Sequence, residues 1–160
     1  MAVDMFLKIG TLEGESKDSV HAKKIDVLAW SWGMSQSGTT HGGGGGGAGK
    51  VNVHDISITK YVDSSSNALI KSVCDGTHHA DATLIVRKAG TTPVEYIVIK
   101  MKEVMITSVS LGGSGGEERL TENVSLNFAE FEYAYKPQKT DGTAEAAKEF
   151  KFSIQENVVK

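Results

Sequence analysis

The stretch KIDVLAWSWGM, residues 24–34, indicates the fold class of the chain. Large apolar and small side chains alternate in it: the large ones are Leu28, Trp30 and Trp32, and the small ones are Ala29, Ser31 and Gly33. Such alternation is typical of a strand with one buried face. We predict that the large set fills a core, where each aromatic side chain buries about 150–250 Å². The small set then faces away from that core.

The rest of the chain extends this β assignment. Val and Ile together number 25 against 8 Leu, and β-branched residues suit strands better than helices. Strand-like segments recur at residues 2–9, 50–58, 80–88, 94–110, 120–135 and 150–154. The phase of the alternation slips near residue 54, which predicts a bulge or a bend. In residues 120–135 it reverses, which predicts one strand that changes faces at a corner.

One helix is predicted, over about residues 64–74. Its apolar face has the spacing i, i+3, i+4, i+7, Asp63 or Ser64 is its cap, and Gly76 is its stop; the face consists of Ser66, Leu69, Ile70 and Val73. Cys74 is expected to be a small buried hydrophobic residue. The predicted fold is mostly β, a two-sheet barrel or sandwich with this helix on its side, in a single domain covering residues 1–160.

Charge and hydropathy exclude several classes of protein. The chain has 17 basic and 20 acidic residues, a net charge of −3, and no long basic run, which argues against nucleic acid as a partner. Its longest apolar run is about four residues, too short for membrane insertion. The first ten residues lack the charged and apolar regions of a secretory signal. Its one cysteine cannot form an internal disulfide. We therefore expect a cytoplasmic protein.

No catalytic, cofactor or metal site is predicted. Gly44-x4-Gly49-Lys50 imitates a P-loop, but Val51 stands where Ser or Thr should follow the lysine, and a strand-like segment comes next instead of a helix. His79 and Asp81 would share one strand face, yet two ligands without a third are weak grounds for a metal site. No G-x-S-x-G nucleophile signature occurs.

Several longer segments carry more information: MAVDMFLKIG (1–10), IDVLAWSWGMSQSG (25–38), GGGGGAGKVNV ending at residue 53, ITKY (58–61) and GGSGGEERLTENVSLNFA (112–129). Over residues 1 to about 135 they closely resemble the haemolysin-coregulated protein (Hcp) family, the inner-tube subunit of bacterial type VI secretion systems. The ERLTENVSLNFA block and the paired tryptophans are specific, whereas the glycine run alone is not. Residues 136–148 carry no matching motif.

The resemblance implies a structural protein and not an enzyme. Six subunits would form a ring with a channel, and rings would stack into a tube. The implied partners are further copies of the chain, a trimeric spike protein, contractile sheath and baseplate components, and effector toxins held in the channel. The protein would be cytoplasmic before firing and then leave the cell through the type VI apparatus without a signal peptide.

Two sets of residues follow from this interpretation. Ala29, Ser31 and Gly33 are expected to line the channel and contact effectors; the alternative is that they touch a neighbouring subunit. The loop 36–49 is long for a compact domain and is expected to contact the next ring, with candidate residues Gln36, Gly38, Thr40, His41, Gly42, Gly45 and Gly47.

Two other classes of protein remain as alternatives. A β-sandwich module that binds carbohydrate or peptide would be monomeric and would carry an exposed aromatic platform. A small hydrolase would need a clustered nucleophile and base.

Overall fold

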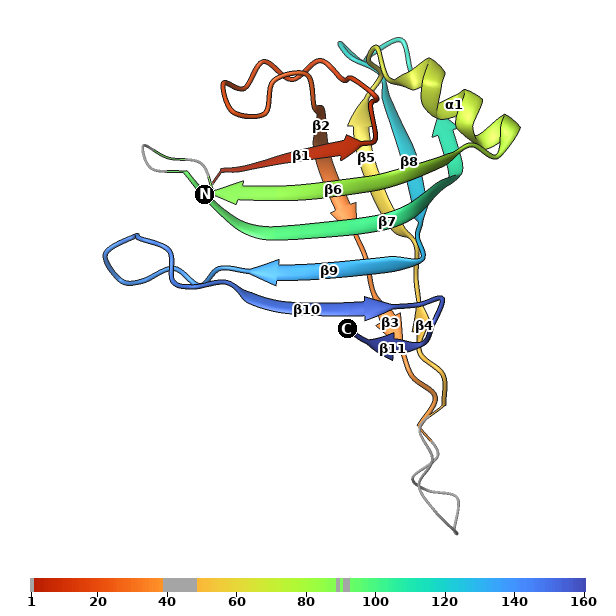
Figure 1. The fold of residues 1–160 in the computed structure, drawn as a ribbon. Coiled ribbons are helices and arrows are strands. Elements are labelled where there is room, and N and C mark those ends of the chain that lie inside the picture. Colours follow the sequence, from red (N-terminus) through yellow and green to blue (C-terminus); the bar gives the residue numbers. More distant parts are fainter. Residues whose placement is uncertain (1, 39–48, 89, 91–92) are drawn as a thin grey trace.

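The computed structural model describes residues 2–38, 49–88, 90 and 93–160. Over these residues the chain forms eleven strands and one helix (Figure 1). In chain order they are β1 (Val3–Ile9), β2 (Ile25–Ser31), β3 (Met34–Ser35), β4 (Asn52–Val53), β5 (Ile56–Tyr61), α1 (Ser66–Asp75), β6 (His78–Lys88), β7 (Val94–Leu111), β8 (Thr121–Asn127), β9 (Glu130–Tyr135), β10 (Lys148–Ser153) and β11 (Val158–Val159).

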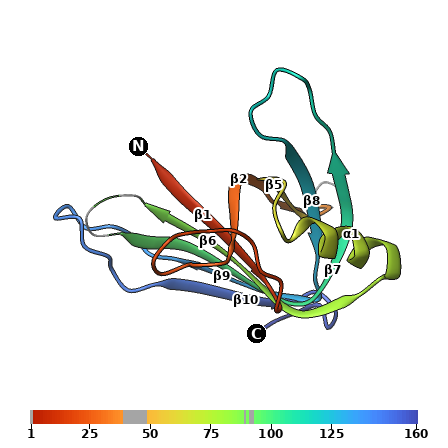
Figure 2. The same cartoon turned by 90° about the horizontal axis from the view of Figure 1, so that it is seen from above.

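Six strands close into a barrel in the order β7-β6-β1-β2-β5-β8, because β7 also pairs with β8. The length of β7 permits this closure: its first part pairs with β6, and from Met105 onward it pairs with β8. Beyond β7 the sheet continues through β9, β10 and β11, while β3 and β4 form a second small sheet. Figures 1 and 2 show the long strands β1, β6, β7, β9 and β10 crossed by β2, β5 and β8. The predicted mostly β barrel is confirmed.

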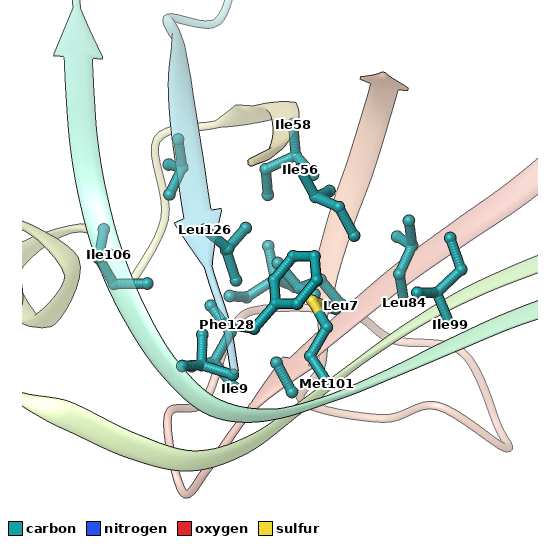
Figure 3. Packing of buried hydrophobic residues seen from close by; sticks show 14 of the residues in the cluster. Leu7, Ile9, Ile56, Ile58, Leu84, Ile99, Met101, Ile106, Leu126 and Phe128 are labelled. Carbon is teal, nitrogen blue, oxygen red and sulfur yellow. The ribbon is translucent and has the colours of Figure 1, made fainter. Parts of the chain in front are cut away.

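The core lies where the two sets of strands cross. Leu7, Ile58, Ile99 and Leu126 are almost completely buried, and they come from four different strands. Figure 3 shows their side chains gathered in the same apolar cluster. Trp30 and Trp32 are partly buried and pack against this cluster, as their place in the sequence pattern predicted.

The prediction that Leu28 belongs to the same core is wrong. The pairing of β2 with β5 shifts between Val27 and Ala29, so that Leu28 is an extra residue in a β-bulge. An extra residue reverses the alternation beyond it. Val27 therefore joins the core with Trp30, whereas Leu28 is 39% exposed.

The predicted single strand over residues 120–135 is also wrong. The segment forms two strands, β8 and β9, with Phe128 in the connection between them. Phe128 and Phe131 are both buried, and their ring centroids lie 6.2 Å apart. The reversal of the pattern therefore marks a turn between two strands. Near residue 54 the predicted bend is confirmed, because β4 ends at Val53 and β5 begins in the other sheet at Ile56.

The helix α1 begins two residues later than predicted and ends at Asp75, before Gly76, whose φ of 69° is left-handed. Its buried positions are Ser66, Leu69 and Ser72. The predicted apolar face is thus only partly correct, because Ile70 and Val73 are each 37% exposed. Cys74 is exposed, so the prediction that it is buried is wrong. It stands next to Val73 on the solvent side of a helix that buries only one narrow stripe.

Candidate functional site

The strands that cross the long sheet carry a distinct outer surface. We call β2, β5, β8 and the last part of β7 (Met105–Leu111) the transverse sheet. Cross-strand pairs align its residues in two rows on the face away from the core; the rows are Ser31–Ser57–Ser125–Ser108 and Ala29–Thr59–Asn123–Ser110. These eight residues form what we call the small polar face. None of them is charged, and none has a side chain larger than asparagine.

Hydrogen bonds within this face hold some of its side chains in place. The hydroxyls of Ser57 and Ser125 lie 3.3 Å apart, and the Thr59 hydroxyl donates to the Asn123 side-chain oxygen at 2.7 Å. Both links join β5 to β8 across the middle of the sheet. The result is an even surface of hydroxyl, amide and methyl groups, which can make weak neutral contacts and offers no strong electrostatic site.

Local sequence explains why the small residues share one face. In β5 and β8 they alternate strictly with residues buried in the core, for example Ser57 between Ile56 and Ile58. In β2 and β7 the alternation is broken by register shifts, after Val27 and after Ile106. A bulge on each side returns the small residues to the outer face.

The structure separates the three residues predicted for the channel. Ala29 and Ser31 are exposed on the small polar face, as their orientation in the pattern predicted. Gly33 is half-buried beyond the end of β2, and its carbonyl accepts from the backbone N–H of His54 at 3.0 Å. Sequence reasoning missed the other six members of the face. Their signal was the recurrence of Ser, Thr and Asn at every second position of three later segments, which form β5, β7 and β8.

The transverse sheet has two edges without a strand partner among the described residues. On one side, β1 pairs with β2 only at Ile25 and Asp26, which leaves the edge of β2 beyond Val27 unpaired. On the other side, β6 stops pairing with β7 at Met105, so the outer edge of the following residues is also unpaired. Free edges on opposite sides of one sheet can pair with further copies of the same chain.

Two of the residues predicted for ring stacking, Gln36 and Gly38, follow β3, which projects together with β4 from the barrel (Figure 1). Gln36 and Gly38 are exposed. Thr40, His41, Gly42, Gly45 and Gly47 lie outside the described residues, as does Gly44 of the P-loop imitation. After Lys50 the chain enters the strand β4 and not a helix.

The possible metal ligands have other contacts. His79 Nε2 lies 3.0 Å from the Ser72 hydroxyl on α1, and burial lowers the pKa of the imidazole. Asp81 pairs across the sheet with Lys102. Within the described part of the chain, no three His, Cys, Asp or Glu side chains are grouped so that they could hold a metal ion. No helix there has the length and apolar character needed to cross a membrane.

A charged cluster fixes the β1–β2 connection against the barrel. Arg87 on β6 is buried, and its guanidinium donates to Asp18 of the connection at 3.1 Å and to Asp4 at 3.0 Å. It also lies 5.1 Å from the centre of the Phe6 ring. The Arg87 hydrogen bond holds the pKa of Asp18 well below its usual value. Because Phe6 alternates with the core residue Leu7, this cluster lies on the opposite face of β1 from the core.

Known proteins share this architecture and much of this sequence. A family model described as type VI secretion system effector, Hcp, matches residues 6–135. Protein hcp1 of Pseudomonas aeruginosa is 58% identical over 160 residues, and the match covers 99% of each chain. The chain belongs to the Hcp family of type VI secretion proteins. The resemblance that the sequence predicted is confirmed.

Solved Hcp structures have the same fold. A structure described as a type six secretion system protein covers 99% of this chain and 100% of its own, with a TM-score of 0.94 and 26% identity. The alignment with Hcp1 of Salmonella typhimurium covers 100% of this chain and 100% of that protein, with a TM-score of 0.80 and 29% identity. A type VI secretion system effector of Yersinia pestis covers 94% of this chain and 99% of its own, with a TM-score of 0.77 and 31% identity.

The positions of the two tryptophans bear on one of the alternative classes of protein. The alternative of a carbohydrate-binding or peptide-binding module required an exposed aromatic platform. In this Hcp protein Trp30 and Trp32 pack against the core cluster, and the Trp32 indole donates to the His54 carbonyl at 3.0 Å. The tryptophans therefore stabilise the fold and do not form such a platform.

Proposed function

We propose that the chain is the subunit of a secreted tube whose wall is the transverse sheet. The observation that carries this proposal is the combination of two free strand edges with an uncharged outer face on one four-stranded sheet. Pairing the β2 edge of one copy with the β7 edge of the next is a head-to-tail contact, and such contacts close into a ring when the rotation permits. Six copies are what the Hcp family implies.

In this ring the small polar face lines the channel. A channel that admits toxins needs a wall that leaves room and binds weakly, and Ala29, Ser31 and their neighbours supply one. Gly33, which follows β2, would lie at the end of the same channel wall. Effector toxins are held there before export. The protein acts as structure and carrier, without an enzymatic role.

Rings stack through unlike faces and leave an open filament. We assign part of this contact to the loop 36–49, which includes Gln36 and Gly38. The tube then works with a trimeric spike protein, a contractile sheath and a baseplate. It is cytoplasmic before firing and leaves the cell through the apparatus.

Cross-linking between the two edges tests the ring contact. Ala29→Cys and Ser110→Cys are placed together in a Cys74→Ser background, in which no other thiol remains. Within one chain these positions lie three strand spacings apart, about 14 Å, too far for a disulfide. A bismaleimide whose span is well below this distance should link only separate copies and produce a ladder of bands that ends at six copies. Each single cysteine serves as a control, and a double variant that stays monomeric would refute edge pairing.

A further inference from the structure

One pair of charged residues is buried inside the transverse sheet. Lys60 on β5 and Glu122 on β8 lie directly opposite each other on the core face, and both are fully buried. The Lys60 ammonium donates to Glu122 Oε1, and it also lies 3.1 Å from an Asp63 carboxylate oxygen. Glu122 Oε2 has no hydrogen-bond partner within the described structure. An ion pair in this position contributes little net stability but is costly to break.

Apart from Tyr61 opposite Thr121 at the end of the two strands, the other pairs between β5 and β8 do not distinguish the observed register from one shifted by two residues. On the core side Ile56 faces Leu126 and Ile58 faces Val124, and these branched aliphatic residues are nearly interchangeable. On the outer side the small polar face consists of similar hydroxyl and amide groups. A shift of two residues keeps every side chain on its own face.

Chain connections do not fix this register either. A short turn sets the register of a hairpin, but α1, β6 and β7 all lie between β5 and β8 in the chain. The β7–β8 connection contains GGSGG at residues 112–116, and glycine-rich chain is a weak constraint.

We infer that Lys60 and Glu122 are the specificity-determining residues that set the register of β5 on β8. In one shifted register Lys60 would face Val124, and in the other Glu122 would face Ile58. Each alternative leaves a charge buried opposite an aliphatic side chain, which only the observed register avoids.

The helix α1 is attached to the same pair. The Ser66 hydroxyl donates to Glu122 Oε1 at 2.7 Å and accepts from the backbone N–H of Asp63 at 3.0 Å. Lys60 also donates to this hydroxyl, at 3.3 Å. The first residue of α1 is therefore positioned by the ion pair, and a shifted register would have to detach it.

This register matters for assembly, a consequence that rests on the proposed function. The free edges belong to β2, paired with β5, and to β7, paired with β8. Because the barrel is closed through β1 and β6, a shift of two residues between β5 and β8 requires a matching shift in another pair, such as the two-residue pairing of β1 with β2. It would displace one edge along the other by about 6.4–6.8 Å. Copies with displaced edges could not close into a regular ring.

Disulfide trapping reports the register directly, in a Cys74→Ser background. Thr59→Cys with Asn123→Cys reports the observed register, in which these residues are paired. Thr59→Cys with Ser125→Cys, or with Thr121→Cys, reports the two shifted registers. In the observed register the latter pairs are diagonal neighbours about 7–8 Å apart, beyond the reach of a disulfide. All pairs lie on exposed or half-buried positions of the outer face.

The decisive variant replaces both charges, Lys60→Met with Glu122→Leu, so that neither is left unpaired. We expect it to fold, to form disulfides with the shifted reporters as well as the native one, and to lose ring assembly. Ile58→Val is the matched control, since it weakens the same core but keeps the charges, and only its native reporter should react. Lys60→Arg keeps the charge and should also keep the native register.

A double variant that reacts only at the native reporter and still assembles would overturn the inference. The register inference and the proposed function can fail independently of each other. If the parent protein forms no ring, the tube proposal fails, but the reporters still decide whether the ion pair sets the register.

Discussion

Ser31 on β2 lies directly opposite Ser57 on β5, on the face of the barrel that points away from the core. One position earlier, Trp30 lies opposite Ile58 on the core face. Two neighbouring residues thus serve different purposes: the tryptophan stabilises the barrel, and the serine contributes to a surface available to other molecules.

Added bulk at Ser31 should affect cargo and not assembly. Ser31→Gln places six longer side chains on the proposed channel wall. We expect an unchanged ring mass and melting temperature, but less co-purification or secretion of at least one effector toxin. Ser19→Gln, on the exposed β1–β2 connection, is the control. If Ser31→Gln breaks the ring while the remaining rings still hold cargo, Ser31 is an interface residue instead.

Shortening the glycine run should affect stacking alone. Replacing Gly42–Gly47 by two glycines leaves the barrel and both edges of the transverse sheet unchanged. Rings should still form, as measured by sizing chromatography, while secretion is lost. Loss of the rings themselves would place this loop in the contact within a ring.

The bulge in β2 predicts a contrast between adjacent residues. Val27→Ala should lower the free energy of unfolding by about 2 kcal/mol, because Val27 is 6% exposed. Leu28→Ala should change it by at most about 0.5 kcal/mol, as expected for a surface site. Urea unfolding of the two variants measures this contrast. The reverse order would show that Leu28 is the core residue.

The buried ion pair predicts a large penalty for removing one partner. Lys60→Met leaves the Glu122 carboxylate buried without its cation, which should cost about 3–5 kcal/mol. The double change Lys60→Met with Glu122→Leu should recover most of this loss. A double-mutant cycle in urea provides the measurement, and additive effects of the two substitutions would contradict the coupling.

The contribution of Asp18 should depend on pH. Its pKa is lowered in the folded protein by Arg87, from an ordinary value of 3.8. The unfolded chain therefore binds a proton at a higher pH than the folded one, so the stability that Asp18 contributes is complete above about pH 4 and decreases as the pH falls further. Asp18→Asn should be less stable than the parent at pH 7, and the difference should shrink in acid. A difference that is constant down to pH 2 would contradict this account.

Alternation in the sequence was enough to predict the β class, most strands and the outward orientation of Ala29 and Ser31, and helical spacing was enough to predict the helix. Alternation failed at Leu28, because one inserted residue reverses the phase and the residue types near it do not show where the insertion falls. Alternation also led to the prediction of β8 and β9 as a single strand. In a single strand Phe128 and Phe131 would lie on opposite faces, whereas the turn between the two strands allows both to be buried in the same core. The small polar face was missed as a unit because it depends on pairs such as Thr59 with Asn123, which are far apart in the chain.

The mass of the native particle at micromolar concentration tests the central claim most directly. Native mass spectrometry should show six copies of the 17.1 kDa chain, the number that the Hcp family implies for a ring closed through the edges of β2 and β7. A clean monomer or dimer under the same conditions would contradict the account of this protein as the subunit of a tube.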